Sequence, residues 1–161
     1  MVRIQEIKQK LAEIPDPEIP VINIAELGIL RSVENEAGQI KIVITPTYSG
    51  CPAMNQIEKD IENKLKEIGV NNFKIEMVYQ PAWTTDWMTE NAKRKLLDYG
   101  ISPPESASYD KNSITGNIKK IICPVCKSYE TKLISQFGST ACKALYQCEK
   151  CLEPFDYFKC I

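Results

Sequence analysis

Two pairs of cysteines near the C-terminal end constrain the fold of this 161-residue chain more than any other feature. The pairs are Cys123/Cys126 and Cys148/Cys151, each spaced as Cys-x-x-Cys, and residues 127–147 lie between them. A Cys-x-x-Cys turn places two thiolates on one side of a tight loop, and two facing turns complete a tetrahedron around a metal ion. The sequence therefore predicts one metal site held by four cysteines.

The identity of that metal stays open at this stage. We favour zinc in a zinc ribbon, because a segment of this length is too small to be stable on its own core without a metal. The competing interpretations are a rubredoxin-like iron centre, an iron–sulfur cluster and a redox-active Cys-x-x-Cys pair. Turns of this kind often carry glycine after the second cysteine, but Lys127 and Leu152 stand there. The apolar residues available for packing are Leu133, Ile134, Phe137, Leu145, Tyr146, Phe155, Tyr157 and Phe158.

The chain contains no histidine, which excludes several classes of site. Ser-His-Asp and Cys-His nucleophiles, histidine-bearing zinc sites and Glu-x-x-His di-iron sites all need that side chain. The net charge of −1 gives no reason to expect nucleic acid or an anionic membrane as a partner. The N-terminus lacks a signal-peptide pattern and no stretch is apolar enough to span a membrane, so we expect a cytoplasmic protein.

The N-terminal part predicts an α+β domain, because helical and strand periodicities follow one another along the chain. The predicted order is helix 4–14, strands 29–33 and 39–45, helix 52–68, strand 73–79 and helix 88–99. An α-β-β-α-β-α order favours an antiparallel or mixed sheet with helices mainly on one face. We predict three parts: this domain over 1–100, a linker rich in Pro, Ser and Gly over 101–117, and a β-rich zinc ribbon over 118–161.

Cys51 is the candidate reactive residue of the N-terminal domain. It follows the stretch TPTYSG and precedes Pro52, which suits a first helical turn, so the thiol lies at or beside the start of a helix. Unpaired backbone N–H groups and the helix dipole favour an anion there, and we expect a lowered pKa for the Cys51 thiol. Thr45 and Thr47 are near enough in sequence to line the same loop. A purely structural role for the cysteine is the alternative.

Several other residues have two interpretations. Cys142 and Cys160 are either buried small side chains or additional thiolate ligands. Of Trp83 and Trp87, we expect one to be buried and the other to contact a partner. Tyr79 is expected in the core.

The N-terminal part resembles the SufT-like family of iron–sulfur carrier domains, the MIP18/DUF59 type, through DPEIPVINIAELGIL, TPTYSGCPAM and QPAWTTDWM. The C-terminal part contains CPVC, FGSTACKALYQC and CLEPFDYFKC. Together the two parts resemble the PaaD/PaaJ family, the D-type components of phenylacetyl-CoA epoxidase systems. The C-terminal match is the more specific of the two.

This resemblance implies an accessory protein of aerobic phenylacetate degradation, in which a multicomponent monooxygenase converts phenylacetyl-CoA to its ring 1,2-epoxide. Asp16 and Glu18 match the family's acidic motif, Thr45 and Thr47 its threonine-bearing loop, and Cys51 the cysteine associated with iron–sulfur handling. The implied partners are the other epoxidase subunits, including a ferredoxin-type reductase. No catalytic activity of its own is expected, because the chain lacks the histidines of a di-iron oxygenase and any dinucleotide fingerprint.

The leading hypothesis is maturation or delivery of an iron–sulfur cluster, with Cys51 as a ligand. A single cysteine cannot hold a cluster, so the other ligands would come from a second protomer in a homodimer, from Cys142 or Cys160, or from a client protein. The alternatives are a purely structural bridging subunit with zinc, a nucleic-acid-binding zinc ribbon and a thiol enzyme. The near-neutral charge disfavours nucleic acid, and no basic partner near Cys51 in sequence supports the enzyme.

Overall fold

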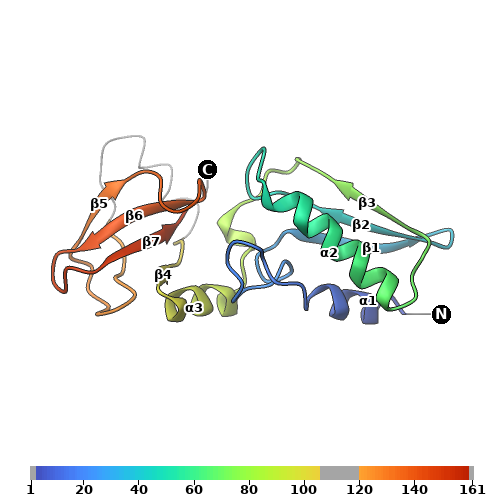
Figure 1. The fold of residues 1–161 in the computed structure, drawn as a ribbon, viewed down its shortest axis with the longest axis horizontal. Coiled ribbons are helices and arrows are strands. Elements are labelled where there is room, and N and C mark those ends of the chain that lie inside the picture. The colour runs from blue at the N-terminus through green and yellow to red at the C-terminus, as the bar shows by residue number, and fades with distance from the viewer. Residues whose placement is uncertain (1–2, 106–119, 160–161) are drawn as a thin grey trace. The chain divides into compact units, whose positions relative to one another are not determined.

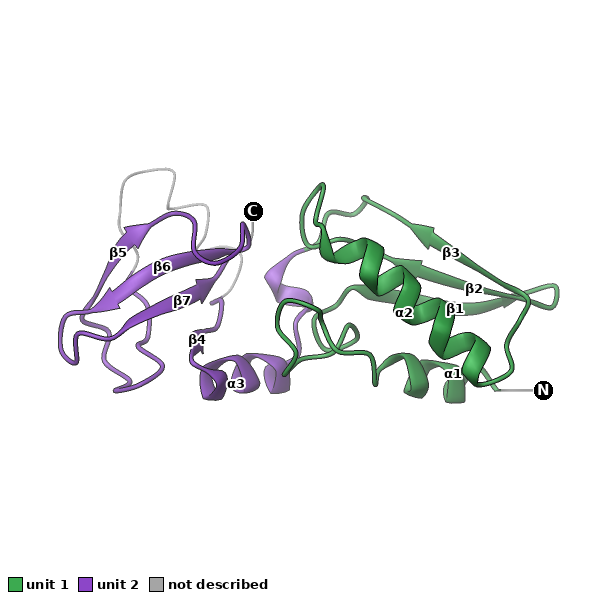
Figure 2. Ribbon diagram, viewed as in Figure 1, with its two compact units in different colours: residues 1–83 green, residues 84–161 purple. Residues whose placement is uncertain are grey.

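The structure is a computed structural model that describes residues 3–105 and 120–159. It divides into two compact units, residues 1–83 and residues 84–161 (Figure 2). No helix in the described part of the chain is both long enough and apolar enough to cross a bilayer.

Unit 1 is a mixed three-stranded sheet with two helices. The chain forms α1 (Ile4–Leu11), β1 (Leu30–Glu36), β2 (Gln39–Ile44), α2 (Ala53–Glu67) and β3 (Phe73–Met77). The strand order is β1-β2-β3, with β1 antiparallel and β3 parallel to the central β2. Figure 1 shows α2 running along one face of this sheet, and α1 contacts both β1 and α2.

The helical periodicity of α2 and the strand alternation of β2 determine which of their residues lie in the core of unit 1. On α2, Ile57, Ile61 and Leu65 recur at helical spacing and are fully buried. On β2, alternate residues such as Ile42 and Ile44 are fully buried, while the residues between them are partly exposed. One face of the sheet is therefore covered by helices and the other faces solvent, as the predicted α+β class requires.

Unit 2 contains a four-stranded sheet. Its elements are the short 3₁₀ helix η1 (Thr85–Trp87), α3 (Glu90–Tyr99), β4 (Ile101–Ser102), β5 (Thr131–Ser135), β6 (Lys143–Cys148) and β7 (Pro154–Phe158). The order is β4-β7-β6-β5, with β5, β6 and β7 antiparallel and β4 parallel to β7. Tyr146, Phe155 and Tyr157 pack with Cys123 and Cys148 in its core.

Two features of unit 2 differ from what the sequence suggests. The compact units divide between Trp83 and Thr84, so α3 groups with the four-stranded sheet, and residues 101–102 form a strand. Of the rest of the predicted linker, residues 103–105 belong to no helix or strand, and residues 106–117 lie outside the described residues. Ile134 and Phe137 are not packed in the core but are 51% and 66% exposed, because β5 is an edge strand and Phe137 lies beyond its end.

Candidate metal centre and cysteine site

The four cysteines of the two Cys-x-x-Cys pairs converge in unit 2. Their sulfur atoms all lie within 4.8 Å of one another. Cys123 Sγ lies 3.7 Å from Cys151 Sγ, and Cys126 Sγ lies 3.5 Å from Cys148 Sγ. Cys123 and Cys148 are fully buried, whereas Cys126 and Cys151 are exposed.

This sulfur cage has the dimensions of a tetrathiolate metal site. A zinc–sulfur bond of about 2.3 Å gives a regular tetrahedron with an edge of about 3.8 Å. The sulfur separations of 3.5 and 3.7 Å fall close to that edge. Four thiols this close together cannot all ionise without a cation between them, so the donor set fits a metal ion that prefers sulfur.

The backbone of the second turn is arranged for a thiolate ligand. In the second turn, the backbone N–H of Cys151 donates to Cys148 Sγ at 3.5 Å. This N–H is the main cause that lowers the pKa of the Cys148 thiol to about 7. The first turn is closed by the Lys127 N–H, which donates to the Cys123 carbonyl at 3.0 Å. At least one ligand is thus poised to bind as a thiolate.

The residue after each turn has a left-handed backbone. Lys127 has φ = 61° and Leu152 has φ = 64°, in the region that favours glycine. Glycine is common at these two positions in other turns because the turn requires a left-handed backbone there. Leu152 is 67% exposed, so burial of its side chain contributes little free energy to offset the cost of the left-handed backbone.

We expect Leu152→Gly to stabilise the metal-loaded protein by roughly 1 kcal/mol, because glycine removes the left-handed strain. Thermal unfolding followed by circular dichroism measures the change. Leu145→Gly is the matched control: Leu145 lies within β6, where glycine weakens a strand, and this variant should be less stable than the wild type. Equal destabilisation by the two variants would contradict the strain argument.

Cys142 does not join the four-cysteine group. It lies just before β6, whereas Cys148 ends that strand, and six residues of strand span roughly 20 Å. Cys142 is buried, with its Sγ 3.0 Å from Thr140 Oγ1. The prediction that it is an additional ligand therefore fails for this metal site, and the interpretation as a small buried side chain fits better. Cys160 lies outside the described residues.

Cys51 lies immediately before α2. Pro52 is the N-cap residue of that helix, and the Cys51 N–H donates to the Tyr48 carbonyl at 3.2 Å, which closes the turn. The half-buried sulfur interacts with the Ala53 N–H and with the side chains of Thr47 and Tyr48. The predicted position beside a helix start is thus confirmed.

The predicted direction of the Cys51 pKa shift is wrong. Burial raises the pKa of the Cys51 thiol above its ordinary value, and the negative charge of Glu18 raises it further. The hydrogen bonds from Ala53, Thr47 and Tyr48 act in the opposite direction but are outweighed. The free protein therefore holds this cysteine as a protonated thiol at neutral pH.

The other predicted residues of this site separate into two groups. Glu18 and Thr47 act on the Cys51 thiol. Asp16 instead organises its own turn, since its Oδ1 accepts from the N–H groups of Glu18 at 2.9 Å and Ile19 at 2.8 Å. Thr45 is buried, and its hydroxyl has no hydrogen-bond partner within the described part of the chain.

The sequence prediction missed the other wall of the Cys51 pocket. A shallow cavity of about 260 Å³ is lined by Cys51 together with Met77, the last residue of β3, and Tyr79, two residues further along the chain. The Tyr79 hydroxyl donates to Met77 Sδ at 3.2 Å. Tyr79 is 55% exposed, so its predicted place in the core is wrong. Its position two residues past the end of β3 was the signal that could have indicated a rim residue.

Comparison with known proteins places both units in families. The model of an iron–sulfur cluster assembly protein family matches residues 4–75, and that of the PaaD zinc beta ribbon domain matches residues 107–159. An Escherichia coli protein, named as the D component of a 1,2-phenylacetyl-CoA epoxidase, is 47% identical over 159 residues, which cover 99% of this chain and 94% of that protein. The chain belongs to the PaaD family.

The N-terminal part of this PaaD-family chain is similar to shorter proteins. An Fe-S protein maturation auxiliary factor of Porphyromonas gingivalis is 35% identical over 94 residues, covering 57% of this PaaD-family chain and 89% of that protein. The crystal structure of a DUF59 domain from Bacillus anthracis matches with a TM-score of 0.53 at 28% identity, over 58% of this chain and 90% of that one. The expected MIP18/DUF59-like fold is thereby confirmed for the N-terminal part.

Proposed function

We propose that this protein is an accessory subunit of a phenylacetyl-CoA epoxidase system that binds an iron–sulfur cluster or its iron in transit, with Cys51 as a ligand. The observation that carries this proposal is a half-buried thiol at the start of α2, in a pocket open to solvent, on a domain of the iron–sulfur assembly family. The cluster is cargo here and not a resident cofactor.

The chemistry of the Cys51 thiol suits a carrier. Its raised pKa keeps the thiol protonated, and a protonated thiol is a poor nucleophile. Binding iron would displace the proton, and the Ala53 N–H and the hydroxyls of Thr47 and Tyr48 would then stabilise the thiolate. The thiol is therefore weakly reactive in the free protein and becomes a thiolate ligand when a metal cation binds.

A cluster on Cys51 requires ligands from elsewhere. Within the described residues, the four-cysteine group of unit 2 is the one set of three or more histidine, cysteine or acidic side chains that could hold a metal ion. Cys51 therefore contributes a single ligand, and the remaining ones come from a second copy of the chain, from a client protein or from Cys160, which lies outside the described residues. Sharing ligands with a client is what transfer of a cluster needs, because the cluster can move without being released to water.

The experiment is anaerobic cluster reconstitution on protein whose four-cysteine site is already loaded with zinc. Cys51→Ala should lower the affinity for iron and sulfide by at least roughly tenfold, as expected for the loss of a ligand. Iron content and visible charge-transfer absorption measure the uptake. Cys142→Ala is the control, because it removes a cysteine that does not line this pocket, and it should bind as the wild type does.

Equal cluster uptake by wild type and Cys51→Ala would reject the carrier role. Full epoxidase activity of Cys51→Ala in cells, combined with loss of activity when the ribbon is disrupted, would favour the purely structural bridging role. We further propose zinc as the metal of the four-cysteine site, the other epoxidase subunits as partners and the cytoplasm as the location. Metal analysis of the purified protein distinguishes zinc from iron.

A further inference from the structure

The four sulfurs of the metal centre are unequally accessible to solvent. In each Cys-x-x-Cys turn, the first cysteine is buried and the second is exposed. Cys123 and Cys148 are fully buried in the core of unit 2, whereas Cys126 and Cys151 are exposed. Half of the donor set is therefore open to small solutes, and half is shielded from them.

The exposed cysteines lie on stretches of chain that are themselves exposed. Residues 125–127 of the first turn and residues 149–154 around the second are all exposed. Val125 and Leu152 stand beside the exposed cysteines in sequence, but these apolar residues are 61% and 67% exposed. A small solute can thus reach the sulfur of Cys126 or Cys151 without any opening of the sheet.

Each exposed sulfur lies beside a buried sulfur of the opposite turn. Cys126 Sγ is 3.5 Å from Cys148 Sγ, and Cys151 Sγ is 3.7 Å from Cys123 Sγ. A disulfide between the members of either pair therefore needs no large movement of the turns. Such a bond would join the two turns directly, as the metal does.

The chemistry of the ligands makes oxidation selective. Metal binding keeps the four sulfurs as thiolates at neutral pH, and the thiolate is the form that peroxides oxidise. Because the buried sulfurs are inaccessible, the first attack falls on Cys126 or Cys151. The neighbouring buried thiolate then acts as the resolving group.

We propose that Cys126 and Cys151 are the oxidation sites of a peroxide-sensitive switch, in which a disulfide between the two turns releases the metal. This inference rests on the zinc proposed above for the four-cysteine site. Zinc is not redox-active, so the sulfurs supply both electrons. The oxidant is hydrogen peroxide.

The oxidation has two steps. The exposed thiolate attacks one oxygen of hydrogen peroxide, the O–O bond breaks, hydroxide leaves and a sulfenic acid forms. The buried thiolate of the opposite turn then attacks the sulfenic sulfur, an S–S bond forms and a second hydroxide leaves. Two thiolates have been oxidised by two electrons, and peroxide has been reduced to two hydroxide ions. With two of its four ligands consumed, the site releases Zn²⁺, and the two remaining thiolates take protons from water.

The switch is reversible and confined to unit 2. A dithiol reductant breaks the disulfide by exchange and restores all four ligands. The disulfide keeps the two turns together in the meantime, so the site can reform around added zinc. Cys51 lies in unit 1, away from the residues that change.

The test adds hydrogen peroxide to the full-length, zinc-loaded protein in the absence of reductant. A chromogenic zinc chelator measures the released metal, dimedone traps the sulfenic acid, and mass spectrometry of unreduced peptides locates the disulfide. We expect complete loss of zinc, dimedone adducts on Cys126 or Cys151, and a disulfide that joins Cys126 to Cys148 or Cys123 to Cys151. Dithiothreitol followed by zinc should restore the original amide spectrum of residues 120–159.

Cys51→Ala combined with Cys142→Ala is the matched control. It removes two cysteines that do not belong to the four-sulfur group, so it should release zinc at the wild-type rate. Slower release by this variant would overturn the proposal, because the trigger would then lie outside the metal site. A disulfide that includes Cys160 would overturn it for the same reason.

The remaining outcomes separate this proposal from the proposed metal. Absence of zinc from the purified protein, measured before peroxide is added, would overturn both. Zinc that stays bound under peroxide would overturn the switch alone. Dimedone adducts on Cys123 or Cys148, or a disulfide within a single turn, would show that exposure and the cross-turn sulfur contacts do not direct the oxidation.

Discussion

Cys148→Ala is expected to abolish stoichiometric metal binding and to unfold the sheet of unit 2. Cys148 is both a member of the four-sulfur group and a fully buried residue of the surrounding core. Metal binding in small four-ligand domains contributes on the order of 10 kcal/mol to folding, which is comparable with the whole stability of a small domain. The small core of this sheet cannot replace that contribution.

Metal analysis and two-dimensional amide spectra measure this outcome separately for the two units. In Cys148→Ala, the resonances of residues 120–159 should collapse toward unfolded positions, while those of β2 and α2 keep their dispersion. Cys142→Ala is the matched control, since Cys142 is also a buried cysteine of this unit but lies away from the sulfur group. Full metal content in Cys148→Ala would contradict the role given to the sulfur cage.

The four-cysteine group was predictable because its geometry is local. A Cys-x-x-Cys turn orients two sulfurs whatever surrounds it, so only the meeting of the two turns had to be inferred. The same reason explains why Lys127 and Leu152 were identified correctly as unusual: the turn itself demands the left-handed backbone. The strong periodicities of α2 and β2 likewise determined which of their residues are buried.

The environment of Cys51 was not predictable in the same way. The helix start indicated backbone donors, but the burial of the sulfur and the approach of Glu18 depend on how residues 16–19 fold against the loop, which no local pattern reveals. Tyr79 was misplaced because the alternation of β3 was extended beyond its end at Met77. Where the chain leaves a sheet, the next side chains become available for a pocket.

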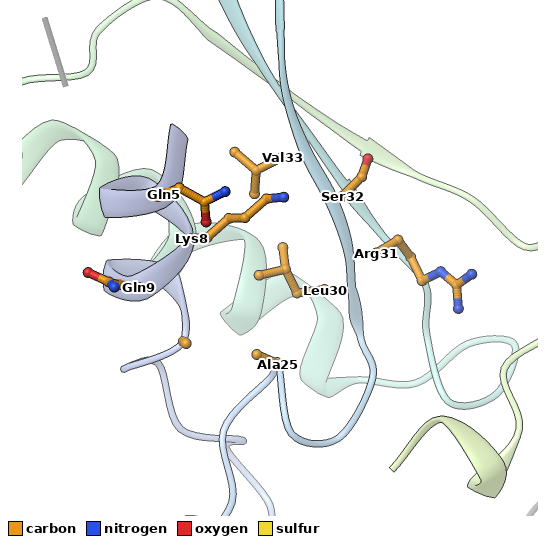
Figure 3. A pocket seen from close by; sticks show the side chains of 9 residues that line it. Gln5, Lys8, Gln9, Ala25, Leu30, Arg31, Ser32 and Val33 are labelled. Carbon is orange, nitrogen blue, oxygen red and sulfur yellow. The ribbon is translucent and has the colours of Figure 1, made fainter. Parts of the chain in front are cut away.

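Pairings between segments that are distant in the sequence could not be predicted either. Ile101 and Ser102 pair with β7, more than fifty residues later, and a two-residue strand has no periodicity to detect. A groove of about 370 Å³ between α1 and β1 (Figure 3) exists because α1 packs beside an edge strand, so it depends on strand order as well as on composition.

Trp83→Ala is expected to destabilise unit 1 strongly. Trp83 is 5% exposed, and its indole Nε1 donates to the Leu27 carbonyl at 2.9 Å. Removing a buried tryptophan costs roughly 3–5 kcal/mol through lost contacts and the cavity left behind. Trp83→Phe keeps most of the ring but leaves the carbonyl without its donor, which costs about 1–3 kcal/mol.

Urea unfolding followed by circular dichroism gives both changes in the free energy of unfolding. Trp87→Phe is the matched control: Trp87 is only half-buried, so this variant should lose less stability than Trp83→Phe. Because the chain has two tryptophans, each Phe variant leaves one fluorophore. The emission of Trp87→Phe, which then reports Trp83 alone, should lie at shorter wavelength, as expected for a buried indole. A cost below about 1 kcal/mol for Trp83→Ala would show that this indole does not anchor the loop of Leu27 to the domain.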